Sequence, residues 1–243
     1  MVPEDLQQKQ REFRAALARL ESRPVYRLLG WAVSGAVLAG QAALMGLSLQ
    51  RPVGWPAGLL LLAAAWLLAD LLGGLVHLIM DHHQRYTGFF GPLTAAFHLH
   101  HRTPRYQDQP LWRVYVHESG FKLWLPPFLA LGLALADPLG PAGLRLWAWV
   151  GLLSSVAEVS HYLCHNSGAR WARSLAAAGL LLPRREHARH HREDNVSYAF
   201  LNGWSNPLLD ILARRGFPGY KQGTDRHFQP DEAEGGSRDA FHP

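Results

Sequence analysis

The feature that most constrains this sequence is the segregation of its apolar residues into long runs. Residues 25–49 and 53–80 are each long enough to cross a hydrocarbon core of about 30 Å as a helix rising about 1.5 Å per residue. A second pair of runs follows at 121–136 and 143–163, and the DPLGP between them is typical of a tight turn. The sequence therefore predicts an all-α integral membrane protein with about four transmembrane helices.

The basic residues are distributed unevenly around these runs. Arginine and lysine crowd three segments, 9–27, 85–113 and 170–226. The two short turns at 50–54 and 137–142 contain only Arg51. Because cytoplasmic loops of membrane proteins carry an excess of Lys and Arg, we expect both termini and residues 81–120 to be cytoplasmic, on the inner membrane in a bacterium. This pattern explains the net charge of +5 better than a nucleic-acid partner, and none is expected.

Composition suggests three parts of the chain. Residues 1–24 are too long and too mixed in charge for the start of a signal peptide, and we expect a cytoplasmic or interfacial segment there. Its apolar positions, including Phe13 and Leu17, fit either a helix on the membrane surface or a solvated helix. Residues 25–221 form the membrane domain. Residues 222–243 are polar and contain glycine, which predicts a disordered C-terminal tail.

Histidines gather at the ends of the apolar runs. The chain has fourteen, and none lies in the first 76 residues. Nine form four clusters: His77; His98, His100 and His101; His161 and His165; and His187, His190 and His191. The charge pattern places all four clusters on one side of the membrane, which predicts a cytoplasmic histidine-rich cap. Histidines scattered through a core would not segregate in this way.

The spacing within the clusters suggests metal binding. Positions i, i+3 and i+4 of a helix share a face, so the rings of His187, His190 and His191 in RREHARHH can converge on one point. His100 and His101 are neighbours and would point about 100° apart, which calls for two metals or for two different roles. Each cluster alone has an ordinary explanation, such as a solvated basic helix. Four separate coincidences explain the pattern less well than one metal centre does.

The types of ligand favour iron or copper over zinc. A structural zinc site usually takes four ligands that include cysteine thiolates, and a catalytic zinc keeps three protein ligands. This chain offers at least eight clustered histidines and a single cysteine, Cys164. Imidazole also suits iron and copper, and so many nitrogens would hold two ions while leaving room for oxygen. His82 and His83 are expected to lie at headgroup level or in a supporting role, and His227 and His242 to be inert.

The same motifs resemble a known family. GLVHLIMD, HHRTP, HYLCH, and LPRREHARHH followed by NVSYAFLNGWSNPLLD are similar to the motifs of the plasmanylethanolamine desaturase family. Plant relatives in that family desaturate an acyl chain of plastid phosphatidylglycerol. The likeness extends from about residue 68 to 215, and H-x-x-H-H with the downstream tyrosine and GW is its most specific part. It implies a membrane di-iron lipid desaturase with O2 as co-substrate.

The resemblance also implies a set of site residues. Carried over position by position, the metal-site residues are His77, Asp81, His100, His101, His161, His165, His187, His190 and His191. Asp81 is either a ligand or an acid that orients His77. Further candidates for orienting residues or additional ligands are His98, His117, Glu158, Glu186, Asp194 and Asn195. Some family members have histidine in place of Asn195, and His98 is unusual for the family, which leaves the lipid substrate open.

Desaturation breaks two unactivated C–H bonds, so the cofactor must carry the chemistry. Two iron ions are expected, and because no heme, flavin or glycine-rich dinucleotide motif is present, the electrons must come from an external donor, a b-type cytochrome or a ferredoxin-like protein. Basic residues near the site could contact lipid phosphates or that donor, or simply reflect the charge rule: Arg102, Arg105, Arg184 and Arg185. Asp70, within an apolar run, must find a partner in the bundle.

The substrate prediction is a membrane glycerophospholipid modified close to its headgroup, with the vinyl-ether bond of plasmalogens preferred. Acyl-chain desaturation and hydroxylation on the same di-iron site remain alternatives. From another class, a metal-binding or transport protein would hold its ligands near the bilayer midplane rather than at one face. A zinc hydrolase would be expected to carry H-E-x-x-H, which the chain lacks.

Overall fold

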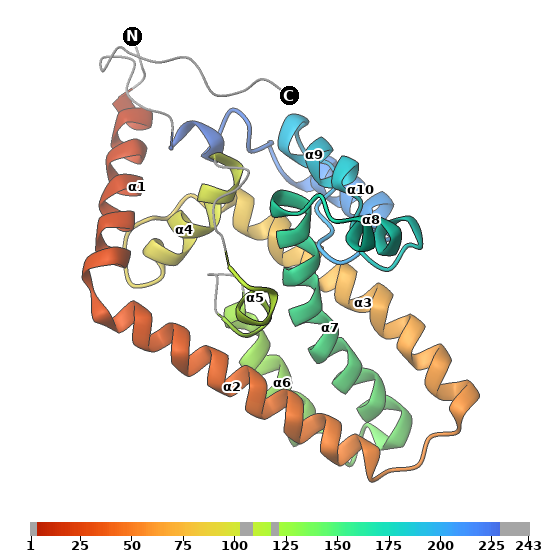
Figure 1. Cartoon of the computed structure of the whole chain (residues 1–243). Coiled ribbons are helices and arrows are strands. Elements are labelled where there is room, and N and C mark those ends of the chain that lie inside the picture. Colours follow the sequence, from red (N-terminus) through yellow and green to blue (C-terminus); the bar gives the residue numbers. More distant parts are fainter. Residues whose placement is uncertain (1–3, 103–108, 118–121, 229–243) are drawn as a thin grey trace.

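The computed structural model describes residues 4–102, 109–117 and 122–228, and the described residues form helices without a strand (Figure 1). In chain order the elements are α1 Glu4–Ser22, α2 Pro24–Leu49, α3 Trp55–His82, α4 Gly91–Arg102, α5 Leu111–Val116, η1 Lys122–Trp124, α6 Leu125–Ala134, α7 Gly140–Asn166, α8 Arg170–Ala177, α9 Arg184–Arg192, α10 Asn206–Gly216 and η2 Thr224–Arg226. The all-α prediction is confirmed for these residues.

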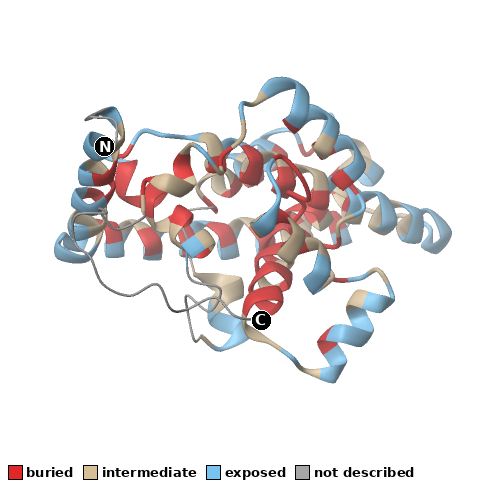
Figure 2. Cartoon of the chain, turned by 90° about the horizontal axis from the view of Figure 1, so that it is seen from above, coloured by how far each residue is buried: buried red, intermediate tan, exposed pale blue. Residues whose placement is uncertain are grey.

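The long helices α2, α3 and α7 form the body of the molecule, together with the shorter α6. The contact between α3 and α7 is the most extensive, and it is lined by small residues such as Ala65, Ala69 and Ala157, which let the two helices approach closely. The buried residues concentrate in the interior, whereas the outer faces of α2 and α3 expose large apolar side chains such as Trp31 and Leu60 (Figure 2). Such extended apolar surfaces are typical of contact with lipid.

The structure has fewer candidate membrane spans than the four that the sequence predicts. Two helices of the described chain, α2 and α3, are long and apolar enough to cross a membrane. The run at 121–136 folds into η1 and the 10-residue α6, which rises only about 15 Å. The run at 143–163 becomes part of the 27-residue α7, whose inward face is polar and buries Ser154, Ser155 and Glu158. That buried polar face lowers the hydropathy of α7 below that of α2 and α3.

The two short turns lie together at one end of the body, opposite the end where α3 and α7 finish (Figure 1). Arg51 in the first turn donates to the carbonyl of Ala136 at 2.6 Å and pairs with Asp137 in the second turn at 2.5 Å. Arg145 joins the same end through a 2.7 Å bond to the carbonyl of Ser48. The one basic residue of these turns is therefore neutralised by a neighbour.

Helix α1 packs on the protein rather than standing free. Phe13 is buried edge-on against Tyr86, with ring centroids 5.2 Å apart, and Ala16 is buried beside it. Arg19 donates to the carbonyl of Tyr86 at 2.6 Å. The apolar stripe of α1 therefore packs on α4 and on the segment before it, and the interfacial or cytoplasmic location of this helix stays a prediction.

Asp70 fixes a loop that supports the histidine end. Its fully buried carboxylate accepts hydrogen bonds from the backbone N–H groups of residues 201, 202, 203 and 205 and from the hydroxyl of Ser205, at 2.7–3.2 Å. This confirms the prediction that Asp70 has partners within the bundle. At Gly74, one turn further along α3, a Cβ would lie 2.3 Å from Cδ1 of Leu209 and 3.3 Å from Cα of Ala199, so a larger residue would require Leu209 and the loop to shift.

The C-terminal boundary also differs from the prediction. Residues 222–228, expected in a disordered tail, include the short helix η2 and bury Thr224 and His227. Tyr86 makes a 2.9 Å hydrogen bond to His227, which is therefore part of the packed structure. Residues 229–243, including His242, lie outside the described residues. Composition did not predict the packing of residues 222–228, because it comes from bonds to partners distant in the sequence, such as that of Thr224 to the carbonyl of Asp81.

Candidate metal centre

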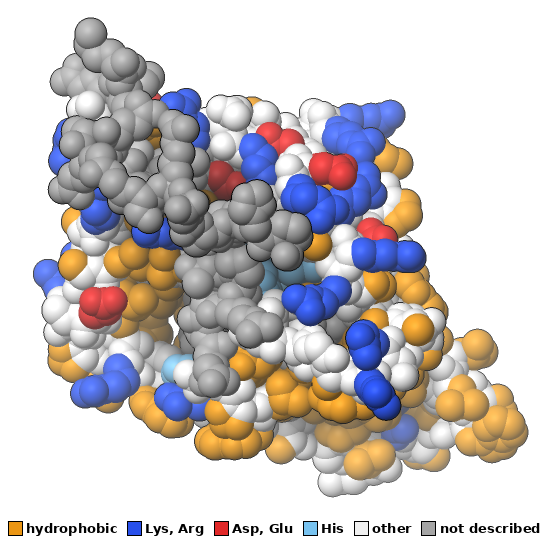
Figure 3. Space-filling model, turned by 45° about the horizontal axis from the view of Figure 1, so that its top comes forward, with side chains coloured by type: hydrophobic (Ala, Val, Ile, Leu, Met, Phe, Trp, Pro, Cys, Tyr) orange, Lys and Arg blue, Asp and Glu red, His pale blue; other side chains and the backbone are white. Residues whose placement is uncertain are grey.

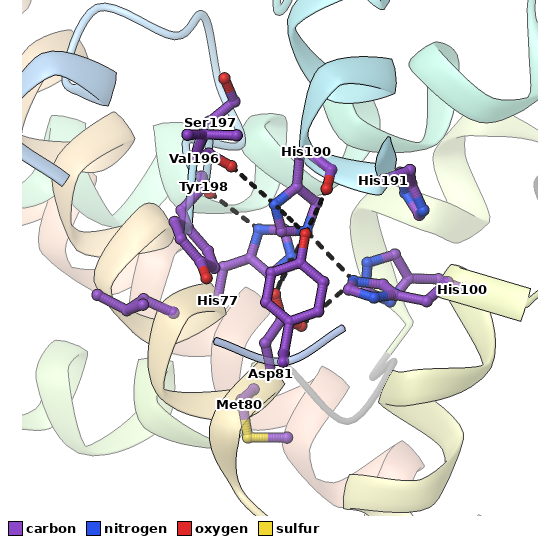
Figure 4. A network of polar contacts seen from close by, with 12 residues as sticks. His77, Met80, Asp81, His100, His190, His191, Val196, Ser197 and Tyr198 are labelled. Atoms are coloured by element: carbon purple, nitrogen blue, oxygen red, sulfur yellow. Dashed lines mark hydrogen bonds and ion pairs between the residues drawn. The ribbon is translucent and has the colours of Figure 1, made fainter. Parts of the chain in front are cut away.

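Four helices bring the predicted histidines together at one end of the molecule. His77 and Asp81 come from the last two turns of α3, and His100 and His101 from α4. The remaining histidines come from α7 and α9, and Figure 4 shows those of α9 that lie near His77 and His100. RREHARHH forms the helix α9 that its spacing predicts, with His187 and His190 buried and its arginines at more exposed positions. The clusters therefore converge as the sequence analysis expected.

The first set of converging residues surrounds Asp81 and is called the Asp81 group: His77, Asp81, His101 and His190, with His100 at its edge. One ligand atom from each of these residues lies within 4.8 Å of all the others. The carboxylate oxygens of Asp81 lie 3.3 Å from Nε2 of His77, His101 and His190. The side chains of Asp81, His77 and His190 are fully buried.

Each imidazole of the Asp81 group is oriented through its other nitrogen. Nδ1 of His77 bonds the carbonyl of Tyr198 at 2.9 Å, and Nδ1 of His190 bonds the carbonyl of Val196 at 3.0 Å (Figure 4). Nδ1 of His101 bonds the carboxylate of Asp225 at 2.8 Å. A carbonyl accepts only from an N–H, so Nδ1 of His77 and His190 carries the proton and the Nε2 lone pair faces Asp81.

This arrangement fits a cation. Both carboxylate oxygens of Asp81 and Nε2 of His77 are buried and make no hydrogen bond. Buried polar atoms are normally satisfied, and a carboxylate surrounded by lone pairs is costly unless a positive charge is present. Although burial opposes protonation, the carboxylates of Asp81 and Asp225 raise the pKa of His101 to about 9. A metal ion would supply that positive charge and displace the proton of His101.

The second set consists of imidazoles alone and is called the His187 group: His161, His165, His187 and His191. Nε2 of His187 lies 3.0 Å from Nε2 of His161, 2.6 Å from that of His165 and 2.9 Å from that of His191. Burial, and then the neighbouring imidazoles, lower the pKa of His187 and His191 well below its ordinary value. These rings are therefore neutral, and their converging nitrogens can bind a cation.

His100 lies between the two groups. It shares one set of ligand atoms with the Asp81 group and another with His187 and His191. Its Nδ1 bonds the carbonyl of Phe97 at 2.6 Å. His100 and His101 share the first set of ligand atoms, and only His100 also belongs to the second, so the prediction of two metals or two roles for this pair stays a prediction.

Aromatic side chains from the loop held by Asp70 pack against both groups. Phe200 stacks on His161 with ring centroids 4.1 Å apart and contacts His77 at 4.4 Å. The ring of Tyr198 lies 4.9 Å from that of His190. The NVSYAFLNGW motif therefore contributes carbonyls that orient imidazoles and rings that exclude water from them.

Several predicted orienting residues support the backbone instead of the metal site. His98 is occupied at both nitrogens, by the carbonyl of Met80 at 2.7 Å and the hydroxyl of Tyr86 at 2.9 Å, and belongs to neither group. Asp194 accepts from the N–H groups of residues 220 and 221, and Asn195 bonds the carbonyl of Phe217. These three predictions are corrected: adjacency in sequence to a ligand did not place the side chains beside the groups.

The other candidates lie at the surface or away from the groups. Glu186 is 3.5 Å from the hydroxyl of Ser197, and His117 packs against Trp31 with ring centroids 5.9 Å apart. Arg102, Arg184 and Arg185 are exposed, and Arg105 lies outside the described residues. His82 bonds the carbonyl of Leu78 on its own helix, and His83 is exposed.

Three residues of the C-terminal segment contact the Asp81 group and were missed by the sequence analysis. Asp225 bonds His101, Thr224 donates to the carbonyl of Asp81 at 2.6 Å, and the hydroxyl of Tyr220 bonds the carbonyl of His190. A tyrosine, a threonine and an aspartate in a polar segment have no distinguishing spacing. No sequence signal would have singled them out.

The fold and the site together define a class of protein: a helical bundle with an apolar helix pair and a histidine-rich centre that could hold metal at one end. Residues 66–214 match the lipid desaturase domain family, and the chain belongs to that family. It is 29% identical over 152 residues to the chloroplastic fatty acid desaturase 4 of Arabidopsis thaliana, a match that covers 60% of this chain and 46% of the plant protein. No solved structure matches the chain.

These comparisons confirm the resemblance at the level of lipid desaturases. Members of that family are membrane-associated oxidoreductases and typically depend on a metal. The plasmanylethanolamine branch remains a prediction. All three sets of ligand atoms come from residues between His77 and His191, inside the matched range. Asp225 lies beyond the matched range.

Proposed function

We propose that this protein is a membrane di-iron lipid desaturase that uses O2 to introduce a double bond into a glycerophospholipid chain. The observation that carries the proposal is the pairing of the Asp81 group with the His187 group through His100. Two adjacent sets of nitrogen and oxygen ligands are suited to two adjacent iron ions. The balanced reaction is –CH2–CH2– + O2 + 2 e⁻ + 2 H⁺ → –CH=CH– + 2 H2O.

When bound, the iron pair would supply the reduction of O2 and the removal of hydrogen from two adjacent carbons. The nine predicted residues would hold the ions, and the carbonyls of Val196 and Tyr198 keep Nε2 of His190 and His77 directed inward. Phe97 and Phe200 pack edge-on or tilted against His77 and keep water away from the buried side of the site. Asp81 offsets part of the charge of the ions.

A lipid substrate agrees with the surroundings of the site. Figure 3 shows basic side chains around the end that holds the histidines and hydrophobic side chains over the far ends of the long helices. An alkyl chain in the bilayer could reach the histidines while exposed residues such as Arg102, Arg184 and Arg185 contact its phosphate or an acidic electron donor. Such a geometry favours a bond near the headgroup, and we propose the bond next to the glycerol ether oxygen, which gives a vinyl ether.

The test is expression in a host that supplies alkyl-ether phospholipids and a compatible electron donor. Acid-labile aldehydes released from the lipids would support vinyl-ether formation. A new double bond in phospholipid acyl chains would instead support acyl desaturation, and a hydroxylated lipid would support the hydroxylase. Metal analysis of the purified protein separates the classes, because about two irons per chain fit a di-iron enzyme, one zinc a hydrolase, and loosely held mixed metals a transporter.

We further propose a multi-pass topology with both termini in the cytoplasm. It is supported by the opposite placement of the two turns and the histidine end, and by the pairing of Arg51 with Asp137. Topology reporters fused to the N-terminus and inserted at residue 139 should report opposite sides of the membrane. Equal cytoplasmic signals at both positions would overturn the proposal.

A further inference from the structure

The segment after α10 runs across the Asp81 group. Residues 219–228, called the C-terminal strap, pass between α9 and the junction of α3 with α4 (Figure 1). They begin five residues beyond the end of the family match, at residue 214. The strap is therefore a part of this chain whose role the family assignment does not supply.

The strap contacts all three helices that form the Asp81 group. On α3, Thr224 donates to the carbonyl of Asp81 at 2.6 Å. On α9, the amine of Lys221 donates to the carbonyl of His191 at 2.6 Å. On α4, Asp225 bonds Nδ1 of His101 at 2.8 Å. A segment that only filled space would not be expected to place polar groups on three residues of one site.

The strap is also held in place at both ends by bonds that involve no metal-site residue. At its start, Asp194 accepts from the backbone N–H of Tyr220 at 2.8 Å and of Lys221 at 3.0 Å. At its end, His227 bonds the hydroxyl of Tyr86 at 2.9 Å, and Gln10 donates to the carbonyl of Arg226 at 3.1 Å. These anchors fix Asp225 independently of His101.

Asp225 has the right chemistry to orient an imidazole. Oδ1 faces Nδ1 of His101, while Oδ2 accepts from the amine of Lys221 at 2.8 Å, so both oxygens are held. His77 and His190 are oriented by main-chain carbonyls, but His101 is oriented by this side chain. A carboxylate that accepts from Nδ1–H fixes the tautomer and makes Nε2 a stronger ligand.

We propose that Asp225 is a positioning residue of the metal centre, and that the C-terminal strap completes the Asp81 group by orienting His101 from outside the residues that match the family. The proposal rests on the proposed metal site. It predicts that the strap controls how tightly one of the two ions is held. The residues of the His187 group have no bond to the strap except the carbonyl of His191, so the second ion should be much less affected.

The experiment compares Asp225→Ala, Asp225→Asn and the control Gln222→Ala in the full-length protein in detergent. Gln222 is an exposed strap residue that belongs to neither group. Iron per chain is measured after equilibration with graded concentrations of a chelator, and the unfolding temperature is measured with and without iron. Loss of an orienting partner costs about 10–100-fold in metal affinity, and we expect this for one of the two irons in Asp225→Ala.

Asp225→Asn should lose less affinity, because its amide oxygen still accepts from Nδ1–H but lacks the charge. If the alanine variant fails to fold, the asparagine variant alone still tests whether Asp225 supports iron binding. The proposal would be overturned if both variants kept both irons with the affinity of Gln222→Ala. If the unmodified protein binds no iron, the di-iron function fails instead, so the two failures can be told apart.

Discussion

The Asp81 group and the His187 group differ in what surrounds the same type of ligand. In the Asp81 group, each of three imidazoles is bonded through Nδ1 to a carbonyl or a carboxylate, and a buried carboxylate lies at the centre. In the His187 group, four imidazoles face one another, and the two described sets of ligand atoms around His187 contain no carboxylate. Nδ1 of His187 is buried without a hydrogen bond.

This difference teaches that the two halves of the centre are organised by different forces. The Asp81 group is fixed by hydrogen bonds that exist without an ion, and its carboxylate attracts one. The His187 group is assembled by helix packing, because His161 and His165 lie one turn apart on α7 while His187 and His191 lie one turn apart on α9. We therefore expect the ion of the Asp81 group to be held more tightly.

The largest expected effect comes from removing a ligand. His187→Ala and His190→Ala should each lower turnover by more than about 100-fold, since even an orienting partner contributes about 10–100-fold. His187→Ala should lose the more weakly held iron and keep the other, whereas His190→Ala should lose the tighter one. The control is His83→Ala, whose side chain is exposed and should leave turnover unchanged.

Two quantities are measured for these variants: the turnover of lipid and the amount of iron per chain. The amount of protein extracted from the membrane checks that each variant folds. Near-normal turnover of His190→Ala would contradict the assignment of α9 to the site. Loss of both irons from His187→Ala would contradict the independence of the two groups.

Asp81→Asn tests the role of charge in the comparison. The variant has the same shape but lacks the carboxylate that faces three imidazoles. We expect the iron affinity of one site to fall about 10–100-fold, which removes about 1.4–2.7 kcal/mol of the stabilisation that iron gives the folded protein. The measurement is the rise in unfolding temperature on adding iron. An equal rise in Asp81→Asn and the unmodified protein would show that the carboxylate does not contribute.

Asp70→Asn should weaken both groups equally, because Phe200 on the loop that Asp70 holds packs on His77 and His161. The amide replaces one acceptor oxygen with an NH2 that faces backbone donors, and we expect about 3–5 kcal/mol lower stability toward unfolding. Asp137→Asn is the control, because that side chain is 91% exposed and should change stability by less than about 0.5 kcal/mol. Thermal unfolding measures the stability of both variants. A similar loss of stability in the two would show that Asp70 has no structural role.

The smallest expected effect concerns acid and the end of the strap. Burial, together with smaller contributions from Lys9 and Arg226 that Asp5 and Glu12 oppose, lowers the pKa of His227 from 6.5 to about 4. Because the pKa of His227 is lower in the folded state, the stability that its neutral ring contributes is fully present above pH 6.5. This stability is lost as the pH falls toward about 4. His227→Gln, which keeps a polar partner for Tyr86, should therefore lose less stability than the unmodified protein between about pH 7 and about pH 5.

Unfolding temperatures across this pH range measure the difference. If both proteins lose the same stability on acidification, protonation of His227 does not loosen the strap. Iron retention in the His187 group should be the same in both, since His227 lies at the far end of the strap from that group.

Some of the structure follows from periodicity and composition. The helical spacing of His187, His190 and His191 was enough to predict α9, but the expectation that all three rings converge on one point was wrong, because His190 joins the Asp81 group while His187 and His191 join the other. Asp70 could be predicted to need partners because an unpaired acid in an apolar helix is costly. The number of spans could not be predicted in the same way, because the inward polar face of α7 and the short α6 are consequences of packing.

The positions of His98 and Asp225 show what reasoning from the sequence could not predict. His98 belongs to the densest histidine motif, yet Met80 and Tyr86 occupy both of its nitrogens. Asp225 stands in a polar segment without a motif, yet it bonds a predicted ligand 124 positions away in the chain. Neighbourhood in sequence sets which residues share a helix face, but not which side chains meet across helices.

The sequence by itself determined the helical class, the one-sided concentration of histidines and the resemblance to lipid desaturases, because these depend on hydrophobic runs and on spacings within single helices. Only the tertiary structure decided that the histidines divide into two groups around Asp81 and His187, and that the strap reaches His101. Those features depend on contacts between segments far apart in the chain, and their geometry is set by the packing of α3, α4, α7 and α9.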